Sequence, residues 1–190
     1  ALTQAVSGLG GRLVSRVVIE DIRYEGALVE VNARGARHLL DQPGADLGGI
    51  TEVMYVCPQA MASVVGVGEP DAGRVGDPAG ELLPPIAALF DGVPMQGHDR
   101  LSGRLDLDDP DGFEGQTGVG AREHGTQMAS LILHGDLNRR DLPLRRRLYV
   151  RPVMKAVPTG ASGTEEFPQD RLLVDLIHEC VLRICDPAGA

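Results

Sequence analysis

Alternating and clustered apolar residues in the first third of the chain predict short strands and one helix. Dense β-branched residues across residues 14–31 predict strands, with a break near residues 25–26. Residues 36–40 predict a short helix that ends before the Pro-Gly pair at 43–44, and residues 50–56 predict a further strand. This order predicts a small α/β module at the N-terminus.

A second series of elements begins with the apolar run Ile-Ala-Ala-Leu-Phe at residues 86–90. Such a run is typical of a strand buried on both faces of a parallel sheet. Residues 147–153 predict a second core strand. Between them lies a predicted helix that opens on His124, with its apolar positions at Met128, Leu131 and Ile132.

The last predicted element is a helix that starts at Pro168. Its apolar positions recur every three or four residues, at Leu173, Leu176, Ile177, Cys180, Val181 and Ile184. Strand, helix, strand and helix in this order indicate the beginning of a doubly wound parallel sheet. The predicted fold class is therefore α/β, a partial doubly wound core preceded by the small α/β module.

Glycine and proline mark the predicted boundary between these two parts. Residues 63–84 are rich in Gly, Pro, Asp and Glu, a composition typical of a linker. The predicted organisation is an N-terminal module at residues 1–62, the linker at 63–84 and the core at 85–190.

Net charge narrows the range of partners. A formal charge of −9 argues against a general nucleic-acid binder. A local basic cluster, which we interpret as a solvated loop, contains Arg139, Arg140, Arg145, Arg146, Arg147 and Arg151. No apolar run approaches the length of a membrane span, so no membrane association is expected.

The cysteines give an expectation about the compartment. Cys57, Cys180 and Cys185 are odd in number and show no Cys-x-x-Cys spacing, so we interpret them as core or near-core thiols. A disulfide framework is not expected, which favours a reducing, cytoplasmic location.

Asp91 and His124 are the candidate catalytic residues. Asp91 ends the predicted strand at 86–90, where open α/β sheets place their ligands. His124 opens a buried helix 33 positions later. An Asp that closes a turn or a His that caps a helix is common alone, but together they are the orienting carboxylate and general base that hydrolysis needs.

The residues around this pair resemble two blocks of the subtilisin-like serine peptidases, the subtilases. Residues 124–130, His-Gly-Thr-Gln-Met-Ala-Ser, are similar to the family's His block, and residues 97–105 to its His-Pro-Asp-Leu-x-Gly-Arg stretch. Residues 89–93, Leu-Phe-Asp-Gly-Val, keep the Asp and a glycine but lack the Ser or Thr that usually follows the Asp. The resemblance implies a serine endopeptidase acting on protein or peptide substrates, with Asp91 orienting and His124 as general base.

The family's third block, Gly-Thr-Ser-Met-Ala-x-Pro, is missing from the chain. Gln127 stands at the nucleophile position of a similar run, but an amide is no nucleophile, and Ser162 lies in a run of altered order. We therefore expect the chain to be a fragment that carries two members of an Asp-His-Ser triad. The alternative is a non-catalytic interaction or regulatory module derived from a subtilase.

Further expectations concern ions and partners. No cofactor is expected, although the acidic residues 106–112 could hold calcium, which many subtilases bind. A metal hydrolase built on His98, His124 and His134 lacks the paired spacing of zinc ligands. The chain most resembles large bacterial intracellular subtilases, some of which are encoded beside an AAA-type ATPase, which implies such an ATPase as a partner. The N-terminal module resembles the family's propeptides in arrangement, and the alternative is an accessory domain with no inhibitory role.

Overall fold

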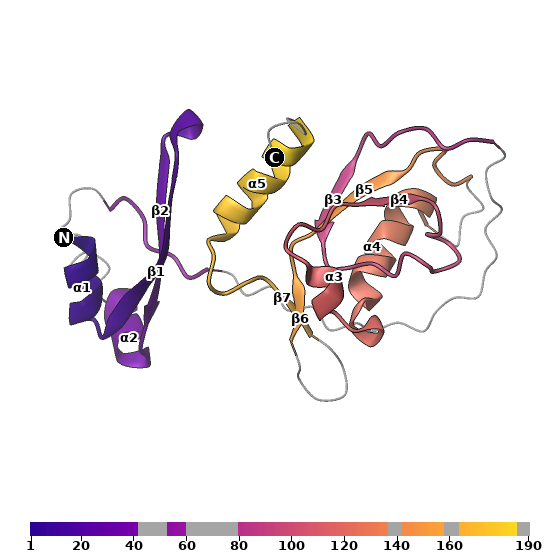
Figure 1. Cartoon of the computed structure of the whole chain (residues 1–190). Helices are drawn as coiled ribbons and strands as arrows, with labels where there is room; N and C mark the ends of the chain where they lie inside the picture. The colour runs from indigo at the N-terminus through magenta and orange to yellow at the C-terminus, as the bar shows by residue number, and fades with distance from the viewer. Residues whose placement is uncertain (42–52, 60–79, 137–141, 158–163, 186–190) are drawn as a thin grey trace. The chain divides into compact units, whose positions relative to one another are not determined.

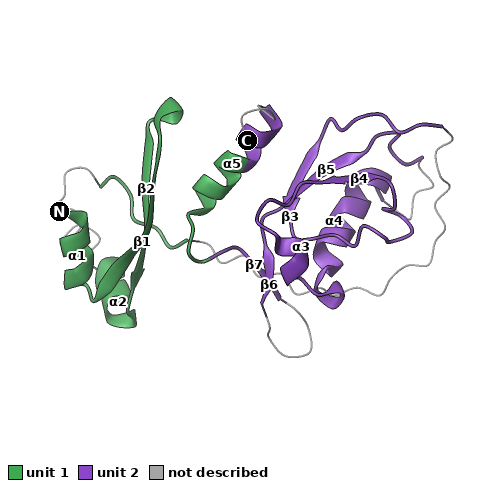
Figure 2. Ribbon diagram, viewed as in Figure 1, with its two compact units in different colours: residues 1–60, 169–179 green, residues 61–168, 180–190 purple. Residues whose placement is uncertain are grey.

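The computed structural model of the chain describes residues 1–41, 53–59, 80–136, 142–157 and 164–185 (Figure 1). The chain divides into two compact units, residues 1–60 with 169–179, and residues 61–168 with 180–190 (Figure 2). The second unit holds a parallel sheet flanked by helices, so the predicted α/β class is confirmed. Most of the predicted linker, residues 63–84, lies outside the described residues, and the domain boundaries stay a prediction.

The first unit is built on an antiparallel hairpin of β1 (Gly11–Ile19) and β2 (Tyr24–Val31). The short helix η1 (Glu20–Ile22) joins the two strands, and Arg23 closes the turn in the left-handed region at φ 51°. The predicted break near residues 25–26 is therefore wrong. Gly26 lies inside β2 opposite Val17, and the ring of Tyr24 on the same face occupies the space that a side chain at Gly26 would need.

Two helices accompany the hairpin, α1 (Leu2–Gly8) and α2 (Ala33–Asp41). The helix predicted at 36–40 is confirmed and begins earlier, because Asn32 caps it by accepting the N–H of Gly35 at 2.8 Å. The strand predicted at 50–56 is wrong for residues 53–56, which lie outside any strand, with Met54 and Tyr55 more than 80% exposed. Residues 50–52 lie outside the described residues.

The second unit contains a three-stranded parallel sheet of β3 (Ala88–Asp91), β4 (Leu105–Leu107) and β5 (Leu148–Pro152), in the order β3-β5-β4. Helix α4 (Glu123–His134) lies against it (Figure 1). The apolar core between helix and sheet consists of Leu89, Leu101, Ala129, Leu133, Leu148 and Val150. The core strand predicted at 147–153 is thereby confirmed as β5.

The burial predicted for the first core strand is wrong. Ile86 is 80% exposed and Ala88 is exposed, whereas Leu89 and Asp91 are buried. Exposed and buried positions alternate along β3, so only the face that carries Leu89 and Asp91 is buried. An apolar run alone does not distinguish a strand buried on one face from a strand buried on both.

The predicted apolar face of α4 is also partly wrong, because Leu131 is 54% exposed. The buried positions are mostly small residues: Gly125, Thr126, Ala129, Ser130, Leu133 and His134. Small side chains let the helix approach the sheet closely, a feature that a hydrophobic pattern does not reveal.

The remaining elements of the second unit are α3 (Phe113–Gln116), η2 (Val119–Ala121) and the antiparallel hairpin of β6 (Lys155–Val157) and β7 (Thr164–Glu166). Helix α5 (Leu173–Cys185) begins after the predicted start at Pro168 and crosses the division between the units. No described helix is long and apolar enough to cross a membrane.

The cysteine prediction is right for one residue of three. Cys180 on α5 is fully buried, whereas Cys57 and Cys185 are exposed, and all three are free thiols. Similarly, Val181 and Ile184 of the predicted apolar stripe on α5 are more than 40% exposed, while Leu176 is buried.

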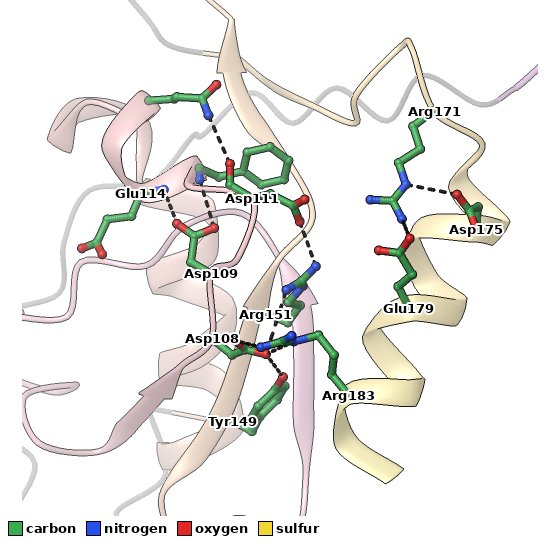
Figure 3. A network of polar contacts seen from close by, with 12 residues as sticks. Asp108, Asp109, Asp111, Glu114, Tyr149, Arg151, Arg171, Asp175, Glu179 and Arg183 are labelled. Carbon is green, nitrogen blue, oxygen red and sulfur yellow. Dashed lines mark hydrogen bonds and ion pairs between the residues drawn. The ribbon is translucent and has the colours of Figure 1, made fainter. Parts of the chain in front are cut away.

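Asp108 anchors the end of α5 to the sheet (Figure 3). It follows β4 and accepts hydrogen bonds from Arg183 at 2.7 and 2.8 Å and from the Tyr149 hydroxyl at 2.5 Å. The hydrogen bond from Arg183 holds the pKa of the Asp108 carboxyl below its usual range. Burial and the adjacent Asp108 carboxylate raise the pKa of Tyr149 to about 12, so the phenol stays neutral as a donor.

The prediction that the basic cluster is a solvated loop is wrong for Arg151 on β5, whereas Arg145 is exposed, and Arg139 and Arg140 lie outside the described residues. The side chain of Arg151 is 1% exposed and donates to Asp111 at 2.8 Å, with Asp108 at 3.9 Å (Figure 3). Arg147 is also engaged, with Asp106 at 2.5 Å. The acidic loop and the basic strand therefore neutralise one another within this unit.

Candidate active site

Asp91 is held at the carboxyl end of β3 by backbone pairing with β5 and the residue that follows it. It pairs with Pro152 across the parallel ladder, and its carbonyl accepts the N–H of Val153 at 2.8 Å. Its side chain is 9% exposed, and Oδ1 accepts the N–H of Gly92 at 2.6 Å. The carboxylate therefore has a fixed position and direction at the edge where α/β sheets place their ligands.

His124 is the second residue of α4, and Arg122 is the N-cap of this helix. Its Nδ1 lies 2.7 Å from Asp91 Oδ1, and its side chain is 23% exposed. The two candidate residues are thus in direct contact. When Nδ1 carries the proton and donates it to Asp91, Nε2 is left as the free acceptor, which is the tautomer a general base requires.

Gly125 and Thr126 explain why this contact is so close. A Cβ at Gly125 would overlap the carbonyl of Gly92 and come within 3.0 Å of Val93, so α4 touches the backbone that follows β3. Thr126 Oγ1 accepts the N–H of Met95 at 2.9 Å and donates to the Arg122 carbonyl at 2.6 Å. The two residues after His124 therefore bind the helix start to the loop after Asp91.

We expect Gly125→Ala to lower the free energy of unfolding by about 1–3 kcal/mol, since its methyl group meets backbone that cannot move aside. Alanine gains up to about 1 kcal/mol in helix propensity, which is too little to offset the overlap. Urea unfolding measures the change. Gly115→Ala is the matched control in α3, where a Cβ has open space, and equal stability of the two variants would contradict the close approach.

The segment before α4 is fixed by charged side chains. Arg122 donates to the carbonyls of Thr117 and Glu114 at 3.0 and 2.8 Å and pairs with the Glu114 carboxylate at 3.3 Å. Asp109 in turn accepts the N–H groups of Phe113 and Glu114 at the start of α3. These contacts set the point from which the helix carrying His124 begins.

The described residues provide no ligand cluster for the two alternatives based on metal binding. Within the described part of the chain, no group of three or more His, Cys, Asp or Glu side chains could hold a metal ion. His134 Nε2 contacts the Arg100 carbonyl at 2.9 Å, and His98 Nδ1 accepts the N–H of Arg100. In the acidic loop, Asp109 and Asp111 are committed to α3 and to Arg151.

Among the residues that the structure describes, none that contacts His124 can serve as the nucleophile of the predicted triad. Its Nε2 has no hydroxyl or thiol hydrogen-bonded to it in the described ranges. Gln127 is exposed and donates to Glu123 at 3.1 Å, and Ser130 is buried in α4 with no hydrogen-bond partner among the described residues. Ser162 lies outside the described residues.

Glu165 on β7 lies beside Asp91 in the candidate site, and the sequence analysis did not predict it as a site residue. It is 2% exposed, and its carboxyl lies against Gly92, the residue next to Asp91. Burial, and after it the charge of Asp91, raises the pKa of Glu165 to about 7. An acidic pair in a polar stretch is typical of a surface turn, so no sequence signal distinguishes Glu165 from Glu166 beyond strand alternation.

Compared with protein-family models, with curated proteins and with solved structures, the chain shows no match. The resemblance to the subtilases therefore rests on the residue blocks of the sequence alone.

Proposed function

We propose that Asp91 and His124 are the orienting carboxylate and the general base of a subtilisin-like serine endopeptidase. The observation that carries this proposal is the 2.7 Å contact between His124 Nδ1 and Asp91 Oδ1 at the carboxyl end of a parallel strand. The contact joins the two sequence blocks that resemble the family's. It also leaves Nε2 as the acceptor for a proton from a nucleophile.

In this mechanism, His124 Nε2 takes the proton of a serine hydroxyl as the oxygen attacks the peptide carbonyl. Asp91 holds the ring in the required tautomer and stabilises the imidazolium that forms. His124 then gives the proton to the leaving amine. The serine comes from outside the described residues, on a segment that reaches the exposed side of the imidazole. The proposed substrate is a protein or peptide, and the proposed location of the enzyme is the cytoplasm.

A fluorophosphonate probe tests the proposal directly, since it reacts with an activated serine. The product of the full reading frame should be labelled at one serine, and His124→Ala should abolish the labelling. His178→Gln on α5 is the control histidine. The 190-residue chain alone should stay unlabelled. Labelling of that chain at Ser130 or Ser162 would show that the nucleophile is misassigned, and an unreactive full-length product would favour a non-catalytic module.

A further inference from the structure

Glu165 is a buried acid that lacks, among the described residues, the hydrogen-bond partners that a buried acid usually has. Its side chain is 2% exposed, and neither carboxyl oxygen makes a hydrogen bond to any described residue. Buried polar groups are nearly always hydrogen-bonded, and isolated buried charges are costly, so an unpaired carboxyl points to a role other than stability.

The Glu165 carboxyl occupies space that is open because residue 92 is a glycine. A Cβ at Gly92 would overlap both carboxyl oxygens of Glu165. Glu165 therefore fills the space beside Asp91 that a side chain at position 92 would take.

The charged groups that face Glu165 are those of the candidate active site. Asp91 on β3 raises its pKa, His124 on α4 lowers it, and the Val93 N–H favours the ionised form without making a full hydrogen bond. On β6 its cross-strand partner is Ala156, which carries no charge. Lys155 and Glu166 oppose one another at the next register position, so they face the other side of the hairpin.

We propose that Glu165 is a positioning residue of the Asp91–His124 pair, a second buried carboxyl whose charge controls how firmly His124 holds a proton. Its catalytic importance rests on the function proposed above, but its electrostatic effect is a property of the resting chain. When Glu165 is ionised, it adds to the negative charge that favours the imidazolium. When it is protonated, that contribution disappears. Because the coupling is reciprocal, the charge of His124 and of Asp91 must also change the titration of Glu165.

Carbon-detected NMR of the 190-residue chain measures this coupling without any substrate. The Glu165 carboxyl should titrate with a midpoint near pH 7, as burial and Asp91 dictate. Asp91→Asn should lower that midpoint and His124→Gln should raise it. In Glu165→Gln, His124 should lose its proton at a lower pH than in the unsubstituted chain. Glu166→Gln, on the opposite face of β7, is the matched control and should leave both titrations unchanged.

A midpoint for Glu165 near its ordinary value of 4.5, or an identical His124 titration in Glu165→Gln and Glu166→Gln, would overturn the proposal. If Glu165→Gln fails to fold, the change of the Glu165 midpoint in His124→Gln still decides. In an active full-length product, Glu165→Gln should also move the acid limb of the kcat/KM profile to lower pH. A shifted His124 titration in a protein without peptidase activity would keep this inference and overturn only the proposed function.

Discussion

His124→Ala is expected to lower kcat of the proposed peptidase by about 10⁶-fold, because it removes the proton acceptor of the proposed triad. Asp91→Asn should cost on the order of 10⁴-fold, since an amide keeps the shape of the carboxylate but favours the wrong imidazole tautomer. The 2.7 Å contact makes the two side chains act as one unit. The double variant should therefore be scarcely slower than His124→Ala alone.

Peptide hydrolysis by the two single variants and the double variant measures these losses, with circular dichroism to check folding. Glu123→Gln, which alters the neighbouring residue of α4 and its contact with Gln127, is a suitable control. Near-parental activity in His124→Ala, or losses that multiply independently, would show that Asp91 and His124 do not belong to one triad.

The second large effect concerns stability and pH. The folded chain raises the pKa of Glu165 from 4.5 to about 7, so the folded state holds this proton more tightly than the unfolded state. The stabilisation is fully present below pH 4.5 and is lost as the pH rises through 7. At about 1.4 kcal/mol per pKa unit, the loss amounts to roughly 3 kcal/mol. Glu165→Gln should remove this part of the pH dependence.

Urea unfolding of the unsubstituted chain and of Glu165→Gln between about pH 4 and pH 9 measures the loss. Other carboxylates titrate in both proteins, so the difference between the two curves isolates Glu165. The free energy of unfolding of Glu165→Gln, relative to that of the unsubstituted chain, should therefore increase from the acid end to the alkaline end of this range. A constant difference across the range, or the same behaviour in Glu166→Gln, would contradict the raised pKa.

Much of the candidate site could be predicted from local sequence. An apolar run ending in Asp91 and a helix opening on His124 are local features, and the rule that parallel strands expose their carboxyl ends at one edge places both residues there. The contact between them follows from that rule. The pattern of apolar residues likewise predicted the strand β5 and the helix α2.

Other features depend on packing between distant segments, which local pattern does not contain. Arg151 is buried because acidic residues of a loop 40 positions away meet its guanidinium. Leu131 is exposed because the small residues of α4 face the sheet instead. Glu165 becomes part of the site because the β6–β7 hairpin places it on Gly92, a position where only the absence of a side chain leaves room.

The overlap between Gly92 and Glu165 has an evolutionary consequence. Two positions that share one space cannot change independently, since a larger residue at 92 requires a smaller or displaced one at 165. Descendants of this chain that acquire a larger residue after the aspartate should therefore have lost the long acid at position 165. Those that keep glycine should retain it. Substitution history at these two sites should consequently show paired replacements, with Gly125 invariant beside them because its neighbour is backbone.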